Sequence, residues 1–153
     1  MILQCQKLQT ALPSKIHYAD DASYNASLAS YWSTQEQSLR PNYVLNLTST
    51  QDVPIALSTM SLLGNCQFAV KSGGHIAQAG AANIQNGVTI DLSGLNQFSL
   101  SKNRTFTTIG PGLRWGQVYT MLETYGLATP GGRSGNVGVG GYLLRGMLKV
   151  TAD

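Results

Sequence analysis

A run of five residues, KSGGH from Lys71 to His75, constrains the fold of this chain more than any other feature. It follows the apolar stretch at residues 68–70, which predicts a buried strand, and its two glycines permit backbone conformations that other residues rarely adopt. Such a backbone can direct its N–H groups toward an anion at close range, and His75 adds a nucleophilic nitrogen beside it. Taken alone, the run predicts either an ordinary tight turn or the start of a phosphate-binding loop.

The composition is that of one folded domain with little charge. The chain has 153 residues, and its hydrophobic content of 42% is enough for a single core. Only 11% of the residues are charged, against about 25% in an average soluble domain, and the net charge of +3 is not gathered in any Lys/Arg cluster. We therefore expect no nucleic-acid partner, and no apolar run is long enough to suggest a membrane partner.

Several features favour a secreted protein, although the first residues lack the apolar segment of a signal peptide, so we expect the leader to be missing. Glycine, serine, threonine and asparagine are plentiful, and N-glycosylation acceptors occur at Asn25, Asn46 and Asn103. Cys5 and Cys66 are too far apart for a redox CxxC pair and too few for a zinc site. They form either a disulfide or two buried thiols, and the secreted composition favours the disulfide.

The first half of the chain contains the pattern of a strand, a helix and a second strand. Residues 43–47 predict the first strand, and residues 51–63 predict a helix that Ser49 or Thr50 can cap. The second strand, at residues 68–70, ends at the KSGGH run, which is where such units bind ligands.

Before this unit, we expect a helix at residues 2–11, an extended piece at 16–18 and a polar stretch without a regular element up to Pro41. After it, residues 88–92 predict a strand, and residues 98–100 and 106–109 predict a hairpin. A helix is expected at residues 115–125, with Gly126 as its C-terminal cap.

Glycine-rich segments follow the ends of predicted elements at residues 72–75, 110–112 and 131–141. Loops of this kind can converge on a dinucleotide. The familiar phosphate motifs are absent, because a GxGxxG pattern starting at Gly138 would need a glycine at Leu143, and no GxxxxGK[ST] sequence occurs. This argues against a nicotinamide Rossmann enzyme and a P-loop nucleotidase. A small β-rich domain, with its glycines in tight turns, remains the alternative to a nucleotide site.

The order of these segments resembles the FAD-binding domain of the vanillyl-alcohol oxidase and p-cresol methylhydroxylase superfamily. The nearest branch is similar to the secreted fungal FAD-linked oxidases that are like berberine bridge enzyme. The resemblance extends from Cys5 to Gly141, and it rests on the segments FAVKSGGH, GAANI, GVTIDL, GPGLRWG and VGVGG in that order. It implies an α+β fold, in which a small βαβ subdomain is followed by part of a second, mixed or antiparallel subdomain.

The resemblance also implies FAD as the cofactor. The flavin pyrophosphate would lie on the main chain of residues 72–74, and His75 would bond covalently to the 8α-methyl group of the isoalloxazine ring. Relatives with a second covalent link have a cysteine where this chain has Ser134, so a single tether is expected. Cys5 and Cys66 match a structural disulfide of related oxidases. The predicted FAD-binding residues are Ser72, Gly73, Gly74, His75, Gly110, Pro111, Gly112, Gly131, Gly132, Val137, Gly138, Gly140 and Gly141.

The end of the chain departs from the family pattern, because Arg145 stands where relatives continue with glycine. We therefore expect a lead-in at residues 1–41, an incomplete FAD-binding domain at 42–144 and a divergent tail at 145–153. The substrate domain, which in the family carries the substrate pocket and the usual catalytic base, is expected to be absent. No residue of this chain is a candidate for that base.

The implied function is that of the flavin-binding region of an FAD-dependent oxidase. In the intact relative, hydride would pass from an alcohol, an amine or a saccharide to FAD, followed by reoxidation by oxygen. A small-molecule substrate is expected only there, and this chain by itself is expected to be inactive. The alternatives are a truncated or mis-spliced product that binds flavin without catalysis, and a glycine-rich secreted binding domain with no flavin.

Overall fold

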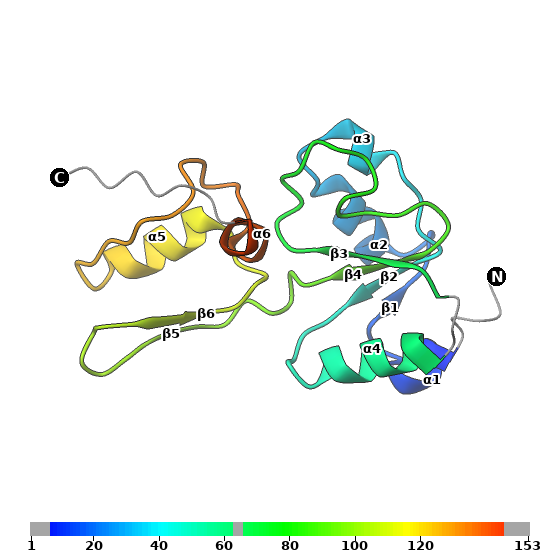
Figure 1. Ribbon diagram of the computed structural model, residues 1–153, viewed down its shortest axis with the longest axis horizontal. Helices are drawn as coiled ribbons and strands as arrows, with labels where there is room; N and C mark the ends of the chain where they lie inside the picture. Colours follow the sequence, from blue (N-terminus) through cyan, green and yellow to red (C-terminus); the bar gives the residue numbers. More distant parts are fainter. Residues whose placement is uncertain (1–6, 63–65, 146–153) are drawn as a thin grey trace.

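The structure is a computed structural model that describes residues 7–62 and 66–145. A four-stranded sheet with helices on both faces forms one part, and a hairpin with two helices forms the other (Figure 1). The first part contains α1 (Lys7–Ala11), β1 (Ile16–His17), α2 (Ala22–Ala29), α3 (Thr34–Gln37), β2 (Tyr43–Asn46), α4 (Asp52–Leu62), β3 (Phe68–Lys71) and β4 (Val88–Asp91). The second contains β5 (Phe98–Leu100), β6 (Thr107–Ile109), α5 (Trp115–Glu123) and α6 (Val139–Leu144).

The sheet has the strand order β1-β2-β4-β3. Strands β2, β4 and β3 are parallel, and β1 pairs antiparallel with β2 at one edge. The predicted strand, helix and strand are β2, α4 and β3, but β4 lies between the two strands. Asn46, Asp91 and Lys71 are in register at the carboxyl ends of the three parallel strands. The KSGGH run therefore leaves the sheet at the carboxyl ends of the parallel strands, where such sheets bind ligands.

Side chains alternate between the two faces of the sheet and build one core on each. Leu45 and Ile90 are buried on the face that α1 and α4 cover, together with Met60 of α4. Val44 is buried on the opposite face with Tyr24 of α2. Figure 1 shows α1 and α4 on one side of the sheet and α2 and α3 on the other. This layering holds the parallel strands between two apolar layers, as a parallel sheet requires.

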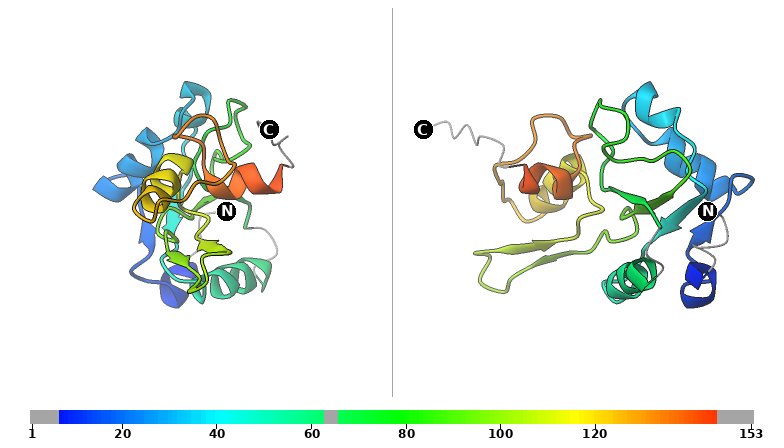
Figure 2. Two further views of the ribbon diagram at one scale, coloured as in Figure 1. Left: turned by 90° about the vertical axis from the view of Figure 1, so that its left-hand side faces the viewer. Right: turned by 45° about the vertical axis from the view of Figure 1, so that its right-hand side comes forward.

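The hairpin and the last two helices have a core of their own. Trp115 and Val118 of α5 are buried against Val139 and Tyr142 of α6, and the partly buried Ile109 of β6 packs on them. The rings of Trp115 and Tyr142 meet edge to face with centroids 5.2 Å apart. Figures 1 and 2 show this part beside the sheet, and in Figure 1 α6 lies closer to the sheet than α5 does. Within the described ranges, no helix is both long and apolar enough to cross a lipid bilayer.

Helix α4 begins at a reciprocal cap. The N–H of Asp52 donates to Ser49 Oγ at 3.3 Å, while Asp52 Oδ2 accepts from the N–H of Ser49 at 2.9 Å and of Thr48 at 3.0 Å. This confirms Ser49 as the capping residue. The N–H of Thr48 is the largest cause that holds the pKa of Asp52 below its ordinary value, with Ser49 and Lys15 acting in the same direction and burial opposing them.

Several sequence predictions of regular structure are confirmed. The hairpin occurs as β5 and β6, and α5 begins at Trp115 as expected. Gly126 follows α5 with a φ of +66°, the left-handed conformation that favours glycine at this position. The helix expected at residues 2–11 is observed as α1 from Lys7, and its first residues lie outside the described part. The helix expected at residues 51–63 is observed as α4, and Leu63 also lies outside the described part.

Other predictions were wrong. Helices α2 and α3 occupy the stretch for which no element was expected, because serine and asparagine obscure the helical spacing of Tyr24 and Leu28. Helix α6 begins inside the last glycine segment, where Gly140 and Gly141 lower the helix propensity, and ends at Leu144. The strand expected to be buried is the edge strand β3, in which Phe68 is 43% and Val70 45% exposed because β3 has a strand neighbour on one side only.

We predict that Asp52→Asn lowers the free energy of unfolding by about 1 kcal/mol at pH 7, because a neutral amide replaces the carboxylate that accepts two backbone N–H groups. The folded-state pKa of Asp52 is below its ordinary value of 3.8, so the stabilisation is fully present above that value. It is lost as the pH falls through the folded-state pKa.

Urea denaturation of both proteins at pH 7 and at about pH 2.5 measures this difference. The two free energies should differ at pH 7 and approach each other at the lower pH. A difference of the same size at both pH values would show that the charge of Asp52 is not what stabilises the start of α4.

Candidate functional site

Three loops that are far apart in the sequence meet at the carboxyl edge of the sheet. The hydroxyl of Ser72, after β3, donates to the carbonyl oxygen of Pro111 at 2.6 Å. A Cβ placed on Gly73 would lie 2.4 Å from the Cα of Gly138, and a Cβ on Gly138 would lie 2.3 Å from the nitrogen of Gly73. The two backbones thus approach to a distance that only glycine permits on both sides.

These loops enclose a cavity of about 440 Å³. Apolar side chains, including Leu92 and Tyr142, form most of the remaining wall, and Arg145 also lines it. The structure therefore brings most of the residues predicted to bind FAD to one place. Those that line the cavity are Ser72, Gly73, Gly74, His75, Pro111, Val137, Gly138, Gly140 and Gly141.

The other predicted residues lie elsewhere. Gly131 and Gly132 pass over the indole of Trp115, where added Cβ atoms would lie 2.3 Å and 2.7 Å from the ring. Gly112 lines a polar cavity on the α2 side of the strand ends, and Gly110 lines an apolar groove. The close contacts around Gly131 and Gly132 explain these glycines by packing alone.

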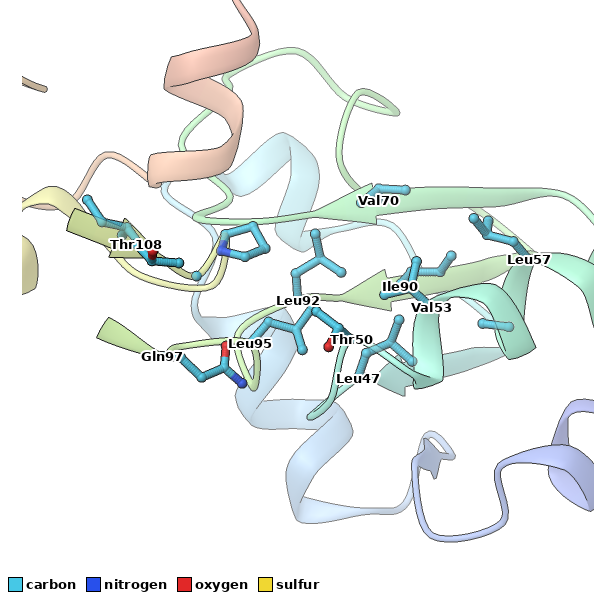
Figure 3. Close-up of a pocket in the computed structure, with 14 residues that line it drawn as sticks. Leu47, Thr50, Val53, Leu57, Val70, Ile90, Leu92, Leu95, Gln97 and Thr108 are labelled. Carbon is cyan, nitrogen blue, oxygen red and sulfur yellow. The ribbon is translucent and has the colours of Figure 1, made fainter. Parts of the chain in front are cut away.

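The apolar groove lies between α4, the ends of β3 and β4, and the hairpin (Figure 3). It has a volume of about 430 Å³, and Leu57, Val70 and Leu92 are among the aliphatic side chains that line it. Its lining residues, all of them in the described ranges, include no charged side chain. The groove suits an apolar occupant, because Thr50, Gln97 and Thr108 are the only polar side chains among the described residues that line it.

The KSGGH loop presents unpaired N–H groups. Gly74 has a φ of +61°, and a Cβ there would lie 2.9 Å from the ring of Tyr31. Both the backbone conformation and the lack of space therefore favour glycine at this position. Among the described residues, the N–H groups of Gly73, Gly74 and His75 donate to no acceptor. Successive N–H groups in such a conformation form an anion-binding concavity.

His75 contributes an unpaired ring nitrogen. Its Nδ1 atom is buried and has no hydrogen-bond partner in the part of the chain that the structure describes. The centroid of its ring lies 5.3 Å from that of Trp32. Buried polar atoms are nearly always paired in folded proteins, and the described chain has two other unpaired ones, Asn46 Oδ1 and Trp115 Nε1. Of these three residues, His75 is the one that lines the cavity.

A buried ion pair lies behind the loop. Lys71 is 1% exposed, and its Nζ atom lies 2.9 Å from Asp91 Oδ2. The same ammonium group donates to the carbonyl oxygen of Ser27 at 2.7 Å and to Ser30 Oγ at 2.6 Å. It also lies 4.6 Å from the ring centroid of Tyr31. These contacts connect the carboxyl ends of β3 and β4 to α2 and to the residues that follow it.

Burial and charge oppose each other in this pair. Burial lowers the pKa of Lys71, and the attraction of Asp91 offsets only part of that effect. For Asp91, burial raises the pKa, but the charge of Lys71 and the hydrogen bonds from Ser27 and Ser93 outweigh it and hold the pKa below its ordinary value. Asp91 therefore remains ionised near neutral pH and provides the charge that keeps Lys71 in place.

Sequence reasoning did not identify Tyr31 and Trp32 as site residues. Two adjacent aromatic residues in a polar stretch were their only sequence signal, and such a signal does not reveal contact with residues 74 and 75. Within the described ranges, no group of three or more His, Cys, Asp or Glu residues is arranged to hold a metal ion.

Comparison with known proteins gives consistent matches. Residues 41–151 match the family profile described as FAD binding domain. The chain is 41% identical over 145 residues to the FAD-dependent monooxygenase sdcF of Emericella nidulans, covering 94% of this chain and 30% of that protein. The chain thus spans about a third or less of the curated relatives it matches.

Two solved structures illustrate the structural likeness. The 6-hydroxy-D-nicotine oxidase of Arthrobacter nicotinovorans has a TM-score of 0.71 and 27% identity, over 81% of this chain and 26% of that chain. The BBE-like #28 protein of Arabidopsis thaliana has a TM-score of 0.76 over 88% of this chain and 28% of its own, and at 23% identity it supports the fold alone.

We predict that Gly138→Ala lowers the free energy of unfolding by about 1 to 3 kcal/mol, because the new methyl group would overlap the backbone of Gly73. The matched control is Gly141→Ala, three residues further on, where a Cβ would meet nothing within 4 Å. Chemical denaturation should show a loss only for Gly138→Ala, and equal stability of the two variants would contradict the close contact.

Proposed function

The chain belongs to the FAD binding domain family, and from this membership we propose that it is the flavin-binding region of an oxidase-type FAD-dependent oxidoreductase. In the whole protein, hydride would pass from an alcohol, an amine or a saccharide to FAD, and oxygen would reoxidise the cofactor. The observation that carries the proposal is the cavity that residues 72–75 and Gly138 line together, with an unpaired nitrogen on the ring of His75.

The residues present fit a flavin dinucleotide. A pyrophosphate is anionic and its oxygens accept hydrogen bonds, and the N–H groups of Gly73 and Gly74 are donors without acceptors in the described chain. These two residues would therefore hold the pyrophosphate, together with Ser72 at the start of the loop.

The apolar part of the cavity fits the other end of the cofactor. Leu92, Ile76 and Ala82 line it near His75, and they would exclude water from the ring system. When bound, FAD supplies the acceptor for a hydride and the route for its electrons to oxygen. The part of this chain is to bind and orient the cofactor.

We assign a single covalent tether to Nδ1 of His75. The support for this is that the atom is buried and has no hydrogen-bond partner among the described residues. A carbon–nitrogen bond would form to the 8α-methyl carbon, with one proton lost from the methyl group, one from the imidazole, and two electrons passed to dioxygen to give hydrogen peroxide. Ser134 in place of a cysteine leaves no thiol for a second link at that position.

We also propose that the protein is a secreted glycoprotein with a disulfide between Cys5 and Cys66. Cys66 is part of the buried core beside α4, while Cys5 lies outside the described residues. Of the three acceptors, Asn103 is exposed beside the turn of the β5–β6 hairpin, and Asn25 is exposed on α2. Asn46 ends the sheet strand β2 and its side chain is partly buried, so this position suits a glycan least.

The tether is tested by expressing the chain with FAD and precipitating it in acid. We expect the wild type to retain yellow flavin in the pellet, and His75→Ala to bind FAD but release it on precipitation. His17→Ala is the matched control, because it removes the only other histidine and leaves the cavity intact. A wild-type pellet without colour would refute the tether, and a titration without saturable FAD binding would refute the flavin site itself.

A further inference from the structure

An exposed tryptophan contacts the proposed tether residue. The side chain of Trp32 is 61% exposed, so its burial contributes little to the stability of the fold. Its ring centroid nevertheless lies 5.3 Å from that of His75, with the ring planes inclined by 41°. This distance and tilt are within the range of favourable aromatic pairs, in which each ring restricts the orientation of the other.

The backbone of Trp32 is fixed to the same loop. Its N–H donates to the carbonyl oxygen of Gly74 at 3.0 Å. The carbonyl oxygen of the preceding residue, Tyr31, accepts from Gln37 Nε2 at 2.9 Å, and its hydroxyl donates to the carbonyl oxygen of Ala82 at 2.7 Å. These contacts fix the backbone at residues 31 and 32, from which the indole reaches the ring of His75.

The ion pair adds a third fixed point. Lys71 donates to Ser30 Oγ at 2.6 Å and lies against the ring of Tyr31. Arg114, at the start of α5, donates to the carbonyl oxygen of Ser30 at 3.1 Å. Residues 30–32 thus connect the sheet, the KSGGH loop and the second part of the molecule. Trp32 is the residue of this segment whose side chain contacts the imidazole of His75.

We propose that Trp32 is a positioning residue for His75. Its ring restricts rotation of the imidazole, so that the unpaired Nδ1 stays oriented for bond formation to the flavin. The inference rests on the proposed tether, and it assigns to Trp32 no contact with the cofactor itself. Because correct orientation of reacting groups accelerates their reaction, loss of the indole should slow tether formation while leaving FAD affinity unchanged.

The experiment follows apoprotein after addition of FAD. Flavin fluorescence measures the affinity, acid-stable flavin measured over time gives the rate of tether formation, and thermal unfolding checks the fold. The variants are Trp32→Ala, Trp32→Phe and the matched control Phe106→Ala, which removes an aromatic side chain that is 65% exposed on the hairpin.

We expect Trp32→Ala to bind FAD like the wild type, to unfold at the same temperature, and to form the tether more slowly by on the order of tenfold. Trp32→Phe should restore most of the rate, and Phe106→Ala should leave it unchanged. A wild-type rate in Trp32→Ala would overturn the inference without affecting the flavin site. The inference would also be overturned if Trp32→Ala lost FAD affinity and tether-formation rate to the same extent, or if Phe106→Ala slowed tether formation by a comparable factor. A wild type that binds FAD without forming a tether would instead refute the proposed tether at His75.

Discussion

The backbones of Gly73 and Gly138 pack directly against each other where the sheet meets the hairpin and its helices. A side chain at either position would place an atom within 2.5 Å of the other backbone, so the two loops can meet only as glycines. Their meeting joins the sheet to the hairpin and helices, and the hydrogen bond from Ser72 to Pro111 brings in the third loop. The cavity is a consequence of this junction between two separately packed cores, which is a common place for a cofactor site.

Charge is arranged to support the same junction. The ammonium group of Lys71 and the carboxylate of Asp91 form an ion pair that is buried behind the loop. The ammonium group also donates to the hydroxyl oxygens of Ser27 and Ser30, and the hydroxyl of Ser27 donates to the carboxylate. Taking such a pair out of water is costly, and removing one partner would leave an uncompensated charge in the core. Because the cation is engaged with Asp91, the anion-binding character of the loop comes from its unpaired N–H groups. The pair fixes the strand ends from which that loop starts.

Much of the fold could be predicted where the signal is local. Alternating apolar residues, separated by turn residues, were enough to predict the hairpin. Gly126 could be predicted as a helix cap because its conformation depends on the helix that it follows. Features that depend on distant contacts were missed or misread. The exposure of β3 follows from strand order. Trp32 is far from His75 in the sequence, and no local pattern connects the two.

We propose that the flavin lies in the cavity formed at the glycine contact. A crystal structure of the protein with FAD would locate the ligand. We expect the pyrophosphate against the N–H groups of Gly73 and Gly74, and continuous electron density between Nδ1 of His75 and the isoalloxazine ring. FAD bound in the apolar groove of Figure 3, or the KSGGH loop without any ligand, would contradict the claim.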